Sequence, residues 1–216
     1  WDDDFDFPEE AEQKFMESVD EEVAEMARES LETWPLDFFS EDMAPLWKTV
    51  MAETGNENLL KDEEEVTDTE VSEEEMDAIR AHKEHVEETL RELHGDTITV
   101  YRGVYGDAGS KLQEAAESGE EVEWERRAVE SYTTELTYAK SYAQNPGGVV
   151  VEDEIPVEDV WASSHTGFLD ANENELVVQR DEVESIDPEN IHTPETLDDG
   201  EWNLKEVAEQ AREFRT

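Results

Sequence analysis

The excess of acidic over basic side chains is the feature that most constrains how this chain can fold. Its 216 residues include 63 Asp or Glu and 16 Lys or Arg, so the formal net charge is −47 at pH 7. Repulsion on this scale destabilises a compact state in dilute buffer. Molar salt removes most of it, because the Debye length falls to about 3 Å at 1 M. The charge therefore predicts a fold adapted to high salt.

The distribution of the acidic residues bears on which class of protein this is. They are spread along the whole chain, a pattern that resembles proteins of extreme halophiles. Two other classes carry much acid, mimics of nucleic acids and chaperones for basic proteins, but these usually concentrate it in one block or face. The sequence has no basic stripe, so we expect no direct binding of nucleic acid. The cytoplasm of a halophilic host is therefore one expected location.

The length of 216 residues suits one domain or a domain with an appendage. The hydrophobic fraction of 36%, with six Trp, seven Phe and five Tyr, is enough for one core. There is no Cys, which excludes disulfides and thiolate chemistry. No apolar run approaches the roughly 18 residues of a membrane span, so none is expected. Because the chain starts at Trp1, we expect a processed or trimmed piece.

Residues 1–94 are predicted to form an acidic tail followed by a helical layer. A first helix opens near Pro8 and a short apolar segment covers residues 43–51. The clearest helix begins at Ser72, which forms a capping box with Glu75, and ends at Gly95. Its apolar face is expected to consist of Met76, Ile79, Val86, Leu90 and Leu93, interrupted by Lys83. His82 and His85 on this helix are interpreted as part of a solvated face, since a metal site needs more ligands.

After Gly95 the apolar period changes from that of a helix to that of strands. A short helix over 137–143 and a turn at 145–148 interrupt the strands, and 191–216 are predicted to be a linker and a helix after Trp202. The expected fold is α+β, with a mainly antiparallel β core over residues 95–190. The predicted strands are TITVYRG, RAVESYTT, GGVVVEDEI, EDVWAS and ELVVQRDEVESI.

Three groups of polar residues accompany these strands. Arg102 ends the first, Ser131 to Thr133 end another just before a helix, and Glu173 and Glu175 begin a third. Residues i and i+2 of a strand share a face, so the two glutamates are expected to point the same way. Each feature alone has an ordinary structural explanation: a surface ion pair, a β triplet, or chance in an acidic chain. Their order and spacing together indicate a site.

That ordered set resembles the mono-ADP-ribosyltransferase family, in the class with an arginine, a serine motif and a Glu-x-Glu pair. The resemblance covers roughly residues 97–185. VYRG is similar to the first strand of the family, SYTTELTYAKSYA to its serine segment and following helix, and ENELVV to its Glu-x-Glu strand. Tyr132 occupies the middle place of the serine motif, which departs from the usual Ser-Thr-Ser pattern.

The resemblance implies two antiparallel sheets packed crosswise, with NAD as the substrate and no metal. Arg102 would hold the pyrophosphate bidentately, and the main chain of Gly103 would hold the nicotinamide amide. Ser131 and Thr133 would complete the NAD site, with Ser131 fixing ribose or the glutamate. Glu175 would stabilise the oxocarbenium-like transition state, and Glu173 would accept a proton from the attacking group.

The Glu-x-Glu form favours arginine side chains of a protein as the acceptor, and the acceptor itself stays unidentified. Three functions are open at this point. The first is an active transferase of a halophilic archaeon or its virus. The second is a catalytically silent structural or minor head protein of a virion, associated with its capsid or portal. The third is an acidic mimic or chaperone that ignores NAD.

The charge yields a prediction about salt. We expect the thermal midpoint of unfolding to rise steeply between low and molar KCl, because screening removes repulsion from the folded state. Scanning calorimetry or circular dichroism at several KCl concentrations measures this. A midpoint that is flat across the range would remove the argument for adaptation to high salt.

Overall fold

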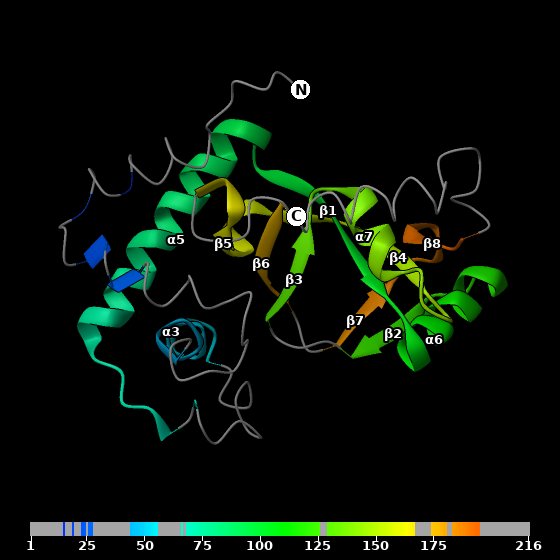
Figure 1. The fold of residues 1–216 in the computed structure, drawn as a ribbon, viewed down its shortest axis with the longest axis horizontal. Helices are drawn as coiled ribbons and strands as arrows, with labels where there is room; N and C mark the ends of the chain where they lie inside the picture. The colour runs from blue at the N-terminus through cyan, green and yellow to red at the C-terminus, as the bar shows by residue number, and fades with distance from the viewer. Residues whose placement is uncertain are drawn as a thin grey trace, which may run out of the picture. The chain divides into compact units, whose positions relative to one another are not determined.

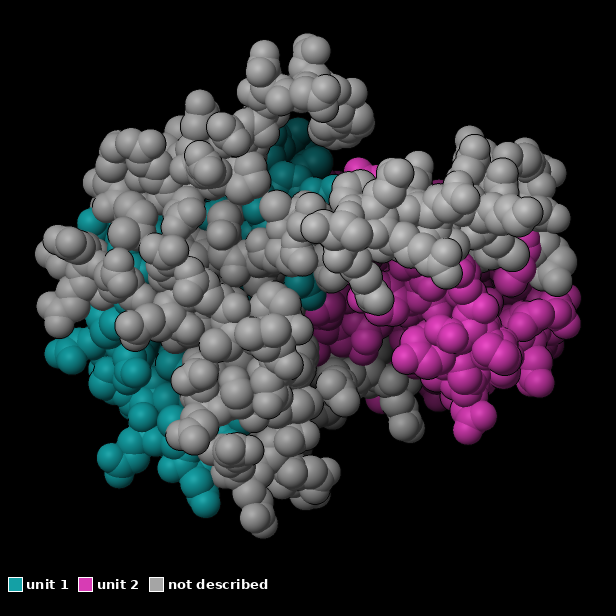
Figure 2. Space-filling view, in the orientation of Figure 1, with its two compact units in different colours: residues 1–96, 157–179 teal, residues 97–156, 180–216 magenta. Residues whose placement is uncertain are grey.

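The computed structural model describes residues 15, 19, 23–24, 26–27, 44–55, 66, 68–125, 129–166, 174–180 and 183–194. The chain divides into two compact units (Figure 2). Unit 1 comprises Trp1–Asp96 and Val157–Gln179, and unit 2 comprises Thr97–Pro156 and Arg180–Thr216. The boundary after Asp96 lies where the apolar period was predicted to change. The return of 157–179 to the first unit was not predicted.

The main element of unit 1 is helix α5, Glu73–His94 (Figure 1). Its predicted start is confirmed: the Glu75 amide donates to Ser72 Oγ at 3.2 Å, and the Ser72 amide donates to the Glu75 carboxylate at 2.7 Å. Its predicted end is confirmed as well, since Gly95 has φ 88° and its N–H donates to the Arg91 carbonyl. Glycine adopts this conformation without the steric cost of a Cβ.

Helix α5 buries one face within unit 1, against α3 (Ala44–Thr54), β5 (Val160–Ser163) and the 3-10 turn η3 (Ser164–Thr166). Lys83, which interrupts the predicted stripe, extends beside Trp161, with Nζ 5.3 Å from the ring centroid, and donates to the Glu158 carbonyl. The prediction was wrong for Leu93, which is 43% exposed in the last turn. The buried face consists of Ala78, Ile79, His82, Val86 and Leu90.

The interpretation of His82 as a solvated residue was wrong, because its side chain is completely buried. Its Nε2 lies 3.3 Å from Thr166 Oγ1, and the ring of Phe15 meets it edge-on. Burial, followed by the nearby charge of His85, lowers the pKa of His82 from 6.5 to about 3. His82 is therefore a neutral core residue, and the 3.6-residue period that places it beside Ile79 and Val86 was the usable signal.

The strands of unit 1 are β5 and β6 (Glu175–Gln179), which pair antiparallel. The register shifts between Val160 and Ala162, which marks a bulge or irregularity. Trp161 is 1% exposed, as expected of a core residue, and its indole N–H donates to Gln179 at 3.1 Å. The two strands thus bury apolar side chains while satisfying the one polar group of the indole.

Unit 2 is organised around the strand pair β1 (Thr97–Val104) and β4 (Val149–Pro156). These strands form an uninterrupted antiparallel ladder from Thr97 opposite Pro156 to Val104 opposite Val149. The order of strands in the unit is β3-β1-β4-β8, with β3 at Val129–Thr133 and β8 at Ile191–His192. Each of β1, β3 and β4 lies where a strand was predicted.

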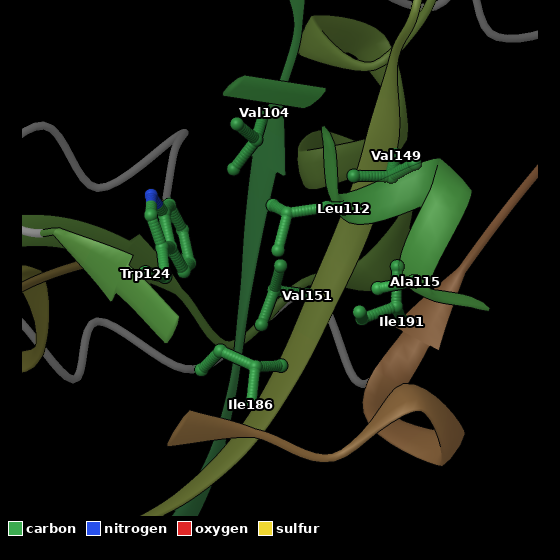
Figure 3. Packing of buried hydrophobic residues seen from close by; sticks show 8 residues of the cluster. All are labelled: Val104, Leu112, Ala115, Trp124, Val149, Val151, Ile186 and Ile191. Atoms are coloured by element: carbon green, nitrogen blue, oxygen red, sulfur yellow. The ribbon is translucent and has the colours of Figure 1, made fainter. Parts of the chain in front are cut away.

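One face of this ladder carries the apolar cluster shown in Figure 3, to which Val104, Val149 and Val151 contribute. Helix α6 (Gly106–Ser118) covers it with Leu112 and Ala115, and the two-stranded pair β2 (Val122–Glu125) and β7 (Val183–Ile186) adds Trp124 and Ile186. Trp124 is 9% exposed, in keeping with its predicted place in the core.

Helix α6 and strand β2 were not predicted. Helix α6 contains Gly106 and Gly109, which are poor helix formers, and its buried residues are only Gly109, Leu112 and Ala115. Gly109 is required by close packing, because a Cβ there would lie 2.1 Å from the Gly147 carbonyl oxygen. The other face of the β1–β4 ladder packs against α7 (Leu136–Tyr142), close to the predicted helix over 137–143.

The fold is therefore α+β as predicted, with N-terminal helices followed by antiparallel strands and a separate two-stranded sheet. The expected helix after Trp202 and most of the first predicted helix lie outside the described residues. Among the described helices, none is long and apolar enough to cross a membrane.

The neutral His82 predicts a pH dependence of stability. Between pH 6.5 and about 3 the unfolded chain gains a proton that the buried ring does not accept. Its contribution therefore lowers the free energy of unfolding as pH falls, by up to about 1.4 kcal/mol per unit. Urea unfolding in molar KCl at pH 7, 6 and 5 should show that the free energy of unfolding falls more steeply with pH for the parent than for His82→Gln. The variant serves as the control because it keeps all the acidic residues of the parent. Parallel pH profiles would contradict this assignment.

Candidate functional site

The alternation of strand β1 assigns Arg102 and Gly103 to opposite faces. Gly103 faces α7: a Cβ at this position would lie 2.3 Å from the Ala139 carbonyl oxygen and 2.7 Å from the Tyr142 Cβ. Arg102 lies opposite Val151 in the ladder and shares its face. The structure thus gives Gly103 a packing role that explains the missing side chain. Its predicted contact with nicotinamide stays a prediction.

Strand β3 continues this alternation. Thr133 is the partner of Tyr101 on β1, and Tyr101 packs against the α7 cluster. Thr133 and Ser131 therefore belong to the α7 face, whereas Glu130 and Tyr132 belong to the face of Arg102. The structure places the arginine and the serine motif on neighbouring strands, but it does not bring the Arg102 and Ser131 side chains to one face.

Arg102 makes three contacts on its face of unit 2. Its Nη1 donates to the main-chain carbonyl of Ser131 at 2.6 Å, and its Nη2 lies 3.6 Å from the Glu130 carboxylate. Its guanidinium carbon is 5.7 Å from the centroid of the Tyr132 ring, within the range of a cation–π interaction. The Arg102 side chain keeps 28% of its surface exposed, against 6% for Glu130. Arg102 is thus oriented by buried neighbours while part of it faces outward.

A second arginine lies over the same tyrosine. The guanidinium carbon of Arg180 is 5.9 Å from the centroid of the Tyr132 ring, and its Nη2 is paired with the Asp153 carboxylate. The Arg180 side chain is 7% exposed and that of Asp153 20%. Asp153 lies opposite Val100 on β1, which places it on the face of Arg102. We call these five residues the Tyr132 cluster: Arg102, Glu130, Tyr132, Asp153 and Arg180.

Sequence reasoning had included only Arg102 and the motif position of Tyr132 from this cluster. A signal for Arg180 was present, because it directly follows a buried strand in a chain with few basic residues. Glu130 and Asp153 gave no signal among 63 acidic residues. Their positions beside the two arginines depend on the register of β3 and β4 against β1.

The face of Ser131 and Thr133 has different surroundings. Thr133 Oγ1 accepts a hydrogen bond from the Glu135 amide at 2.9 Å, which shapes the turn before α7. Tyr101 has its pKa raised by burial first and then by the carboxylates of Glu152 and Glu135. On the same face of β4, the Glu152 carboxylate lies 2.9 Å from Nε2 of His192. The predicted role of Ser131 and Thr133 with NAD is not tested by these contacts.

Glu175 is the first residue of β6 in unit 1 and is 8% exposed. Asn174 before it has φ 44°, a left-handed conformation that asparagine tolerates better than most residues. The extended backbone thus starts at Glu175. Because Asn174 is not extended, the strand alternation that the sequence predicted does not apply between Glu173 and Glu175. Glu173 itself lies outside the described residues.

No group of three or more His, Asp or Glu suited to a metal ion occurs among the residues that the structure describes. Compared with known protein families, curated proteins and solved structures, the chain has no match. The candidate site consequently stands on the residues and their geometry.

The Tyr132 cluster predicts a large difference between two neighbouring acidic residues. Asp153→Asn removes the counter-charge of a nearly buried guanidinium and should lower the free energy of unfolding by about 3 kcal/mol. Glu154→Gln makes the same change of charge at an exposed position, where about 0.5 kcal/mol or less is expected. Urea unfolding of both variants in molar KCl measures the difference. Equal effects would mean that the Arg180–Asp153 pair does not stabilise unit 2.

Proposed function

We propose that this protein is an NAD-dependent mono-ADP-ribosyltransferase that modifies arginine side chains of a protein in high salt. The proposal depends on the position and the contacts of Arg102. Arg102 lies two residues before the end of the central strand β1, is oriented by Ser131 and Tyr132, and keeps part of its side chain exposed. In a chain of charge −47, a dianionic pyrophosphate requires a fixed cation of this kind.

The roles of the remaining residues follow from the resemblance and from the chemistry of nicotinamide cleavage. Arg102 binds the pyrophosphate of NAD, and the main chain of Gly103 binds the nicotinamide amide. Ser131 and Thr133 contribute to NAD binding. Glu175 accepts from the ribose 2′-hydroxyl and stabilises the developing oxocarbenium ion.

Transfer to an arginine makes a further demand, because a protonated guanidinium must lose a proton to attack. Glu173 is assigned as the proton acceptor. The finer fold that goes with these roles is a pair of crosswise-packed antiparallel sheets, as in the family that the sequence resembles. The enzyme would be encoded by a halophilic archaeon or by its virus, and would act in the host cytoplasm or be carried in the virion.

A second candidate is a catalytically silent protein of a virion that keeps this fold and associates with the capsid or portal. One observation favours it, because the side chains of Arg102 and Ser131 belong to opposite faces of their sheet. A serine that holds the ribose of NAD would have to lie on the same face as the arginine that holds the pyrophosphate. Release of nicotinamide from NAD discriminates the two functions, because a silent protein gives none.

The Glu175→Gln variant tests the transferase directly. It keeps the size of the side chain but removes the charge that stabilises the transition state. Turnover of NAD should fall about a hundredfold or more, while binding of NAD persists because Arg102 is unchanged. Release of labelled nicotinamide and calorimetric titration measure the two effects. Equal turnover in variant and parent would show that Glu175 is not the catalytic carboxylate.

A further inference from the structure

Tyr101 on strand β1 lies between two carboxylates on the face of the sheet that α7 covers. Glu152 is its partner on β4, and Thr133 is its partner on β3. Residues opposite each other in antiparallel strands have Cβ atoms about 4.5–5.5 Å apart, so the Glu152 side chain starts beside the Tyr101 ring. On the other side, Thr133 accepts a hydrogen bond from the Glu135 amide at 2.9 Å. Glu135, which precedes α7, is therefore also close to Tyr101.

Solvent reaches all three of these groups. The Glu152 side chain keeps 40% of its surface exposed, Glu135 is exposed and Tyr101 is half-buried. Burial raises the pKa of the Tyr101 phenol most, and the charges of Glu152 and Glu135 raise it further, as expected of carboxylates near the ring. Glu152 contacts His192 with one oxygen. A carboxylate has about four acceptor positions, so Glu152 can take a second donor.

The charge of this face stays negative whatever the state of its basic residues. Three carboxylates belong to it among the residues that the structure describes, those of Glu135, Glu152 and Glu154, since Glu154 follows Glu152 by two positions on β4. The basic residues are His192 on β8 and Lys140 on α7, of which Lys140 is 5% exposed. At most two positive charges therefore accompany three negative ones, and the face attracts a cation.

The tyrosine ring determines which cation such a site prefers. In molar KCl the attraction between exposed charges is strongly screened, and K⁺ competes for the carboxylates. A guanidinium adds two contacts that a simple ion does not make: its planar surface stacks on a tyrosine ring, and its parallel N–H groups bind a carboxylate bidentately. An ammonium group is a compact, strongly hydrated charge without this planar fork. The combination of ring and carboxylates thus favours a guanidinium.

We propose that Tyr101, Glu135 and Glu152 bind the guanidinium of an arginine side chain that a partner protein presents. The guanidinium stacks on the ring of Tyr101 and donates to the two carboxylates. Arg102 belongs to the opposite face of the sheet. The arginine site is therefore separate from the proposed NAD site, and it does not rest on the proposed function.

Titration of the full chain with N-acetyl-arginine methylamide and N-acetyl-lysine methylamide tests this proposal. Both ligands carry one positive charge, so the general attraction of an acidic protein cancels from the ratio of their dissociation constants. In molar KCl, shifts of backbone amide signals in NMR spectra should show that the arginine ligand binds about fivefold more tightly, or better. This comparison needs no variant. Equal binding of the two ligands, or binding of neither at millimolar concentration, overturns the proposal.

Two substitutions of Tyr101 separate the ring from the hydroxyl group. Tyr101→Leu keeps an apolar side chain against the α7 cluster but removes the ring, so the preference for the arginine ligand over the lysine ligand should fall to about twofold or less. Tyr101→Phe keeps the ring and should keep the preference. A folded Tyr101→Leu variant with the full preference of the parent would show that the guanidinium does not stack on Tyr101, which contradicts the proposal.

Glu152→Gln and Glu135→Gln test the two carboxylates, and each should weaken binding of the arginine ligand about fivefold or more. Glu114→Gln is the matched control. It makes the same change of charge at an exposed position of α6, which covers the other face of the ladder, and it should leave the dissociation constant within about twofold of the parent value. Equal weakening by all three variants would mean that net charge alone attracts the ligand. No weakening by any of them would place the ligand elsewhere, and either result overturns the proposal.

Discussion

The eight-residue ladder between β1 and β4 is the constraint on which the arrangement of unit 2 depends. Its regular register sorts every side chain of the two strands between two faces. Val104, Val149 and Val151 fall on the face covered by α6 and the β2–β7 pair, and Gly103 falls on the face where α7 approaches too closely for a Cβ. Arg102 and Asp153 then necessarily share the first face. A slip of one residue would reverse all of these positions at once.

Three of the basic residues that the structure describes lie against buried aromatic rings. Arg102 and Arg180 both lie over Tyr132, and Lys83 lies beside Trp161. In molar salt an exposed ion pair is strongly screened, whereas a contact with a buried ring is screened much less. Arg80, on the exposed part of α5, instead meets three carboxylates, those of Glu53, Glu73 and Asp77. A protein with 16 basic and 63 acidic residues thus uses its cations in two different ways.

Local signals in the sequence were sufficient for α5 and for most strands, but not for α6, for β2 or for the sheet face on which each side chain lies. The capping box of Ser72 and the terminal Gly95 fix α5 within the chain itself, and the runs of Val, Ile and Thr fix the strands. Helix α6 was missed because Gly106 and Gly109 have low helix propensity, and Gly109 is required for close contact with Gly147, which is distant in sequence. The burial of Glu130 and the pairing of Arg180 with Asp153 were equally beyond prediction, since they depend on register between strands far apart in sequence.

The same distinction applies to the candidate site. The sequence predicted a strand at Arg102 and another at Ser131, but it did not predict that the two strands are neighbours, which the structure shows by the pairing of β1 with β3 and by the contact of Arg102 with the Ser131 carbonyl. Which face each side chain takes depends on the partner strand, which a motif cannot specify. A guanidinium has five N–H donors, of which the Ser131 carbonyl takes one and Glu130 lies near another nitrogen. The donors of Arg102 that remain for the proposed contact with a phosphate are therefore determined by β3, through the Ser131 carbonyl and Glu130, and not by the Ser131 hydroxyl.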